Sequence, residues 1–264
     1  MPLLILILVA LSLGPHSAFA TIIIGLRDTQ EIVIGADGMR FDSGTGSAYR
    51  ACKIIQVDSE TVFATSGTIH FDGSGFDIPA LVAAIFRSMG FDAAGQGTMD
   101  QSVRAALTKE LAVASLPDIL NAWPPPPSNV IAVVMIGRIR PDRTLELTRH
   151  TYEVSLTPIR EPVTVEVDRC PGDCPEGDDF TWFAPSGAER ATTPAGAAGR
   201  KASRYRSLTR REGYAGLARK LVKVGIAADR RDCGPPVAIV RLTVEGGVRW
   251  IRQGACQKAD GRNQ

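Results

Sequence analysis

The sequence predicts an α+β fold in which two antiparallel β-sheets lie between layers of helices. β-Branched segments occur in pairs separated by short polar turns, which is typical of antiparallel hairpins. Amphipathic segments with helical periodicity interrupt this series of hairpins. The order along the chain is hairpins, two helices, hairpins, one or two helices and a final hairpin. This order indicates two sheets, each packed with one face against the other sheet and with its second face against helices.

Two hairpins are expected near the amino terminus. The segments "TIIIGLR" (21–27) and "EIVIGAD" (31–37) flank the polar turn "DTQ", and "ACKIIQV" (51–57) and "TVFATSG" (61–67) flank "DSE". The stretch between the hairpins, residues 40–50, is rich in Gly and Ser, so it predicts a loop.

Two helices are expected next. Apolar residues recur at helical spacing over residues 78–89, where Pro79 is tolerated near the start, and again over residues 100–115, where Asp100 is a candidate amino-terminal cap. The proline run in residues 123–129 ends the helical region.

The remainder of the chain predicts two further hairpins, a strand and at least one helix. An irregular surface insertion rich in Pro, acidic residues and Cys is expected at about residues 158–179, and residues 188–206 suit either a poor helix or a loop. The expected elements are strands at 130–139 and 144–154, a strand at 180–187, a helix at 212–228 and two strands around a Gly-Gly turn in 236–251.

Composition excludes little but argues against nucleic-acid binding. The 264 residues carry 30 basic and 28 acidic side chains, a net charge of +2, with no interleaving of aromatic and basic residues. The basic run at 200–211 suits an acidic partner or, as such runs more often do, a solvated face. With only His16, His70 and His150 to join the cysteines, a zinc site is weakly supported, and no cofactor or metal is predicted.

The amino terminus has the features of a secretory leader. Residues 3–13 are apolar but short for a transmembrane helix, and small residues at Ala18 and Ala20 predict a signal peptide, residues 1–20, that is removed after Ala20. No Lys or Arg precedes the apolar run, and an uncleaved anchor is the alternative. Cleavage would give an exported protein, periplasmic or extracellular, with no membrane attachment.

Five cysteines follow the leader, and export would expose them to an oxidising compartment. Cys170 and Cys174 are close enough in sequence to staple a loop, and at least one cysteine must stay unpaired within the chain. Cys52, in an apolar strand, is expected to be a small buried hydrophobic residue rather than a nucleophile.

Cleavage after Ala20 would place the α-amino group of Thr21 beside its own hydroxyl. An α-amine with a pKa of about 7.7–8.0 is partly neutral at physiological pH and can accept the proton of the hydroxyl. Asp37 follows Thr21 by 16 residues, Lys53 by 32 and Gly67 by 46. We expect the Lys53 ammonium to favour the neutral amine, Asp37 to pair with Lys53, and the Gly67 N–H to bind an oxyanion. A lysine in so apolar a strand also needs a buried partner.

This pattern resembles the proteasome β-type subunits of the amino-terminal-nucleophile (Ntn) hydrolases. The resemblance rests on a mature Thr at the start of a strand, "GAD" at Asp37, "CK" at Lys53 and "SG" at Gly67, and it covers residues 21–68. It implies a single domain, residues 21–264, with a four-layer αββα sandwich. It also implies hydrolysis of peptide bonds through an acyl-enzyme, with Thr21 as nucleophile, Asp37 and Lys53 as the activating pair and Gly67 as oxyanion donor.

The resemblance assigns further positions less directly. Supporting roles near the nucleophile fall on Ser186 in "FAPSG" and on Asp229 or Asp232, with Cys233 in place of a second serine. Pocket walls fall on Arg40, Ala51 and Thr65. Gly38 and Met39 stand where the family usually has Ser-Arg, with Arg40 one place later.

Several functions remain open from sequence. The leading one is a threonine peptidase, and the alternatives are a small-molecule amidase of the same superfamily or a catalytically retired binding domain. A serine hydrolase built on Ser66, His70 and Asp72 lacks a nucleophile elbow. Whether the subunits form a homo-oligomer or a ring is also open, and the expected partner is a peptide or amide substrate.

Overall fold

A computed structural model describes residues 22–42, 47–67, 70–71, 76–113, 130–154, 163–173, 181–183, 200–228 and 233–256. Within these ranges the chain is a mixed α+β protein with antiparallel sheets and three helices, which agrees with the predicted class.

The first large sheet joins both ends of the described chain. Its strand order is β12-β1-β2-β13-β14, and every neighbouring pair is antiparallel. The predicted first and last hairpins therefore lie side by side, with β2 in the centre. The strands are β1 (Ile23–Arg27), β2 (Glu31–Ala36), β12 (Thr181–Phe183), β13 (Ala238–Thr243) and β14 (Gly247–Arg252).

The second large sheet combines the other two predicted hairpins. Its order is β11-β10-β9-β6-β5, again antiparallel throughout. Two small two-stranded sheets, β3 with β4 and β7 with β8, accompany it. The strands of all three are β3 (Met39–Asp42), β4 (Ser47–Arg50), β5 (Ile54–Gln56), β6 (Thr61–Gly67), β7 (His70–Phe71), β8 (Phe76–Asp77), β9 (Val130–Ile139), β10 (Leu145–Val154) and β11 (Val163–Cys170).

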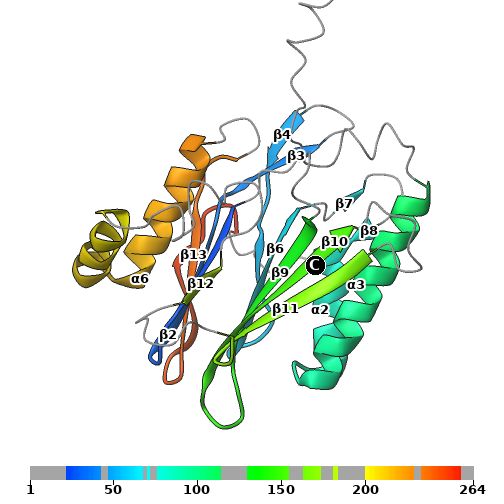
Figure 1. Cartoon of the computed structure of the whole chain (residues 1–264), viewed down its shortest axis with the longest axis horizontal. Coiled ribbons are helices and arrows are strands. Elements are labelled where there is room, and N and C mark those ends of the chain that lie inside the picture. Colours follow the sequence, from blue (N-terminus) through cyan, green and yellow to red (C-terminus); the bar gives the residue numbers. More distant parts are fainter. Residues whose placement is uncertain are drawn as a thin grey trace, which may run out of the picture.

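The helices cover the outer faces of the two sheets (Figure 1). Helix α6 (Arg200–Ala228) packs on the first sheet, while α2 (Ile78–Met89) and α3 (Ala93–Val113) pack on the second. A third apolar cluster fills the space between the inner faces of the sheets. The contact between the sheets is close at Gly25, where an added Cβ would lie 2.4 Å from the Met135 sulfur.

Helix α2 has the predicted bounds because both of its ends are specified locally. The Asp77 side chain accepts a hydrogen bond from the Ala80 N–H at 2.9 Å, and the helix ends at Gly90, which has a positive φ of 77°.

The prediction for α3 was wrong at its start. The helix begins at Ala93, so Asp100 lies inside it and is not the cap. The Asp92 carboxylate instead accepts from the Gly95 N–H at 2.8 Å. Gly95 and Gly97 have low helix propensity, and this hid the first two turns.

Two segments expected to be irregular contain regular structure: residues 40–50 hold the β3–β4 hairpin, and the expected insertion at 158–179 holds strand β11. Of residues 188–206, which suit either a poor helix or a loop, the described part from Arg200 is helical. A kink at Gly213 (φ 66°) separates it from the helix predicted at 212–228. In β11 the alternation of Val with charged residues is a half-buried strand pattern, and Asp168 on it pairs with Arg149 of β10 at 2.7 Å.

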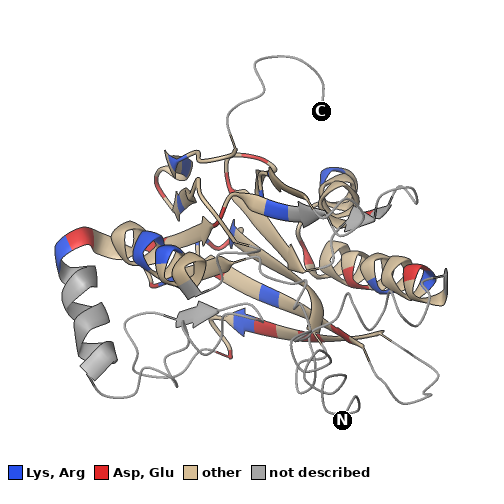
Figure 2. Ribbon diagram, turned by 90° about the horizontal axis from the view of Figure 1, so that it is seen from above, with Lys and Arg blue, Asp and Glu red and all other residues tan. Residues whose placement is uncertain are grey.

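Charge is mixed over the described surface. Basic and acidic positions are interspersed over the sheets and helices and do not gather by sign (Figure 2). None of the helices in the described ranges has the length and apolar character needed to cross a membrane.

Candidate functional site

A buried ion pair lies where the first sheet meets the start of β5. The Lys53 ammonium Nζ is 2.7 Å from Asp37 Oδ1, and both side chains are 0% exposed. The pairing of these two residues, predicted from spacing and from the cost of burying a lone ammonium, is confirmed. Their catalytic roles remain predictions.

Local strand geometry brings the two residues together. Asp37 directly follows β2, and the chain continues into β3, which pairs with β4. The same antiparallel pairing extends to the Ala51 N–H, which donates to the Gly38 carbonyl at 3.0 Å. This pairing brings Lys53, two residues later, next to Asp37. The Lys53 carbonyl accepts a hydrogen bond from the Thr65 N–H of β6 at 3.1 Å. The expected strand at 51–57 is thus shorter, since β5 begins only at Ile54.

Backbone N–H groups surround the Asp37 carboxylate. Oδ1 accepts from Ile22 N at 2.9 Å in addition to Lys53, and Oδ2 accepts from Met39 N and Gly234 N, both at 3.2 Å. Four donors thus hold one carboxylate. Ile22 N is the nitrogen bonded to the carbonyl carbon of Thr21, so one oxygen atom links Lys53 to the peptide bond that follows the predicted nucleophile.

The electrostatics of the pair favour a lysine that gives up its proton more easily than usual. Burial lowers the pKa of the Lys53 ammonium below its ordinary value, and the attraction of Asp37 opposes this lowering. The positive charge of Arg40 adds a smaller decrease in the same pKa.

Gly67 ends β6 in a conformation that favours glycine. Its φ is +90°, and an added Cβ would lie 2.3 Å from the Ile131 carbonyl oxygen on the neighbouring strand β9. The structure thus accounts for glycine here, whereas the oxyanion role remains a prediction.

A disulfide joins the site to the end of the described chain. Cys52, the residue before Lys53, is bonded to Cys256, 204 residues away. Cys52 packs against the apolar cluster between the sheets, as expected of a small hydrophobic residue, but it is only partly buried. Its disulfide was not predicted, since strand composition gives no information on a partner so distant. Cys170 is also disulfide-bonded, while its sequence neighbour Cys174 lies outside the described residues.

Several predicted site residues, Thr21, Ser186, Asp229 and Asp232, lie outside the described residues. The segment after Asp232 is described, and it does reach the pair. The Cys233 thiol is buried and close enough to Lys53 to raise the pKa of its ammonium through Coulomb attraction. The N–H of the next residue, Gly234, donates to the Asp37 carboxylate.

Three features of the site were missed by sequence reasoning. These are the Met39 N–H donor, which is a local turn contact two residues from Asp37, and the Gly234 N–H donor and the disulfide, which depend on tertiary contacts that spacing alone does not encode. The buried Arg40 Nε, which has no hydrogen-bond partner, is a further feature of this region.

Comparison of the chain with protein-family models and with curated protein sequences finds no match.

Proposed function

We propose that the protein is an exported threonine-type amide hydrolase that cleaves peptides and uses Thr21 after removal of residues 1–20. One observation carries this proposal: Asp37 Oδ1 binds both the Lys53 ammonium and the amide nitrogen of Ile22, with no exposed side-chain surface on either charged group. A buried lysine tied to the peptide bond of residue 21 is expected if that residue reacts.

The proposed reaction uses the chain's own groups throughout. The neutral α-amine of Thr21 takes the hydroxyl proton, directly or through a water, as Oγ1 attacks the substrate carbonyl carbon. The Gly67 N–H stabilises the resulting oxyanion. Collapse breaks the C–N bond, the proton passes to the leaving amine, and an ester to Thr21 remains. Water then hydrolyses that ester and regenerates the hydroxyl.

Lys53 supplies the electrostatics for this step. Its positive charge disfavours a second cation nearby, so it keeps the α-amine neutral, and it stabilises the oxygen of Thr21 as negative charge develops there. Asp37 acts through Lys53 as a positioning residue.

The fold supports the same proposal. The placement of helix α6 on one antiparallel sheet and of the α2–α3 pair on the other supports the proposal of a four-layer αββα sandwich, as Ntn hydrolases have. The proposed domain is residues 21–264.

Three measurements test the function. Mass spectrometry of the secreted chain should find Thr21 at the amino terminus. The mature protein should cleave members of a peptide and acyl-amide library and react with a peptide epoxyketone, which bonds to both an α-amine and a hydroxyl.

Matched variants identify the nucleophile. Thr21→Ala should abolish turnover and labelling, Thr21→Ser should retain both, and Thr29→Ala, in an exposed turn, should behave as wild type. Unchanged turnover in Thr21→Ala would exclude the mechanism. Cleavage of acyl amides alone would favour the small-molecule amidase, and an intact leader without labelling would favour a binding domain.

A further inference from the structure

Arg40 lies on the short hairpin that leads away from the ion pair. It stands on β3 opposite Tyr49 of β4, three residues after Asp37. The preceding residue, Met39, is turned toward the 233–234 segment, because an added Cβ on Gly234 would meet its side chain. Successive strand residues point to opposite faces, so the Arg40 side chain leaves the hairpin on the other face.

The guanidinium of Arg40 lacks the carboxylate partner that several other arginines of the described residues have. Its Nε atom is buried and makes no hydrogen bond. Among the residues that the structure describes, no carboxylate forms an ion pair with it, whereas Arg138, Arg149 and Arg241 each have one. The side chain as a whole is half-buried, so an anionic ligand that meets its terminal N–H groups would give this guanidinium the partner it lacks.

The charge balance of the site points to an anionic ligand. Asp37 and Lys53 neutralise each other, so Arg40 leaves one uncompensated positive charge beside them. Repulsion from the Arg40 charge lowers the pKa of Lys53, so the guanidinium lies close enough to the ion pair for the charges to interact. A group bound at Arg40 would thus lie close to the proposed reacting centre.

We infer that Arg40 binds a carboxylate of the substrate, so that the enzyme prefers amides with an acidic side chain or a free carboxylate close to the scissile bond. The two terminal nitrogens of a guanidinium present parallel N–H groups in a planar fork that matches the two oxygens of a carboxylate. This inference rests on the proposed hydrolase function and specifies its substrate class.

The test compares three substrate charges. Fluorogenic peptides with Glu, Gln or Lys at each residue flanking the scissile amide are assayed with wild type, Arg40→Gln and Arg40→Glu. Arg50→Gln, which changes an exposed arginine on the adjacent strand, is the control. At the position that contacts Arg40, we expect kcat/KM for Glu to exceed that for Gln by about tenfold, through KM. Arg40→Gln should remove this preference, and Arg40→Glu should favour Lys. Equal rates for Glu and Gln peptides in wild type, or selectivity that survives Arg40→Gln, would overturn the inference.

A binding measurement separates this inference from the hydrolase proposal. Fluorescence anisotropy of the same peptides with Thr21→Ala requires no turnover. Tighter binding of Glu peptides, lost in Thr21→Ala with Arg40→Gln but kept with Arg50→Gln, supports Arg40 even if no peptide is cleaved. Hydrolysis without charge preference leaves the proposed function standing and removes the assignment of Arg40. Thermal denaturation of each variant excludes unfolding as the cause.

Discussion

Replacement of Asp37 and replacement of Lys53 would remove different numbers of hydrogen bonds from the buried site. Without Lys53, the carboxylate keeps three backbone donors, from Ile22, Met39 and Gly234. Without the carboxylate, those three N–H groups and the buried ammonium lose their common acceptor. The contribution of the pair to stability is therefore expected to be asymmetric.

We predict that Asp37→Asn lowers the free energy of unfolding by about 4 kcal/mol and Lys53→Met by about 2 kcal/mol. An Asn amide must direct its NH₂ at donors on one side or the other, which adds to the loss of charge. Both variants should lose turnover. Urea denaturation measures the free energy of unfolding of each variant, and Lys109→Met, which changes an exposed lysine, is the control. A greater loss for Lys53→Met than for Asp37→Asn would show that the backbone donors do not stabilise the carboxylate.

The pH dependence of turnover should report the same environment. Because burial lowers the pKa of Lys53, its ammonium loses a proton at a lower pH than an ordinary lysine, whose pKa is about 10.4. We expect kcat/KM to rise as the α-amine becomes neutral, with a midpoint below about pH 8, and to fall again before about pH 10.4. A plateau that persists through pH 11 would contradict a role for charged Lys53.

The sequence predicts this ion pair but not its surroundings. A lysine within an apolar segment implies a buried partner, and spacing from a predicted cleavage site singled out Asp37. The Gly234 N–H reaches the same carboxylate from 197 residues away, and Cys52 bonds to a residue 204 positions distant. No periodicity or local propensity encodes contacts at such separations.

At the scale of elements, one carboxylate of helix α3 contributes two polar contacts to the second sheet. Asp100 accepts a hydrogen bond from the Tyr152 hydroxyl at 2.7 Å and lies 2.8 Å from Nδ1 of His150, and both partners are on β10. Burial and the nearby Asp100 charge raise the pKa of Tyr152 well above its ordinary value. The sequence predicts Asp100 as a helix cap, whereas in the structure its carboxylate makes tertiary contacts with two residues of β10.

The raised pKa of Tyr152 gives a prediction for alkaline solution. The phenol ionises near pH 10 in the unfolded chain but only at higher pH in the folded one, so stability is retained below pH 10 and falls as pH rises above it. Tyr152→Phe should cost about 1 kcal/mol at neutral pH and reduce the steepness of the alkaline decline. Chemical denaturation from pH 7 to 11.5 tests this, with Tyr49→Phe, 43% exposed, as control. An equally steep decline in Tyr152→Phe would show that another group is responsible.

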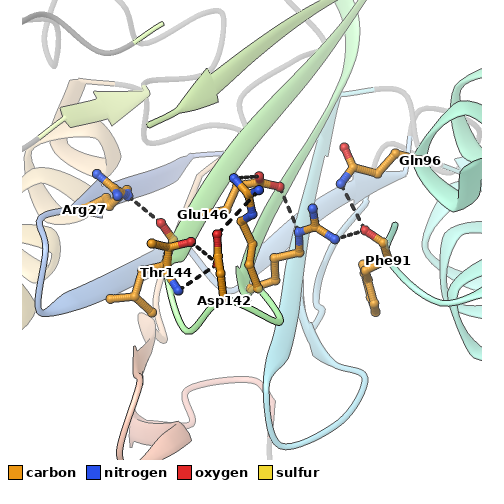
Figure 3. Close-up of polar contacts among 9 residues, drawn as sticks. Arg27, Phe91, Gln96, Asp142, Thr144 and Glu146 are labelled. Carbon is orange, nitrogen blue, oxygen red and sulfur yellow. Dashed lines mark hydrogen bonds and ion pairs between the residues drawn. The ribbon is translucent and has the colours of Figure 1, made fainter. Parts of the chain in front are cut away.

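A second polar network connects elements at the other end of the strands (Figure 3). Arg138 of β9 donates to Glu146 at 2.8 Å and to the Phe91 carbonyl, which also accepts from Gln96 of α3 at 3.2 Å. On the other side of this network, Arg27 of β1 donates to the Leu145 carbonyl at 2.9 Å. The network thus spans both sheets and the start of α3.

This network should support stability without influencing chemistry. Arg138 stands opposite Thr61, at the end of β6 remote from Gly67. We predict that Arg138→Met lowers the free energy of unfolding by about 2 kcal/mol, because it leaves the buried Glu146 poorly paired. Steady-state kinetics well below the melting temperature should give an unchanged kcat/KM. A substantial loss of kcat/KM in a folded Arg138→Met protein would mean that the two ends of the sheets are coupled.

At the scale of the whole molecule, the two sheets are joined by covalent and polar links along one side. The Cys52–Cys256 disulfide connects the segment before β5 to the segment after β14. The Trp250 indole N–H of β14 donates to Gln56 of β5 at 3.1 Å, and the Val248 N–H donates to the Ser59 carbonyl at 2.7 Å. Hairpin patterns predicted the strands of both sheets, but this lateral connection depends on the tertiary pairing of the chain's distant halves.

The disulfide should stabilise the molecule mainly by restricting the unfolded chain. Closing a loop of 204 residues reduces the entropy of that state by an amount equivalent to about 3–5 kcal/mol. Cys52→Ser with Cys256→Ser should therefore lower the melting temperature by roughly 10 °C, measured by differential scanning calorimetry. Cys170→Ser with Cys174→Ser is the matched control, since the sequence predicts only a short loop between these cysteines, and a short loop restricts the chain much less. If the control pair lowers the melting temperature as much as the Cys52–Cys256 pair, then loop length does not determine the stabilisation, and native contacts around each disulfide do.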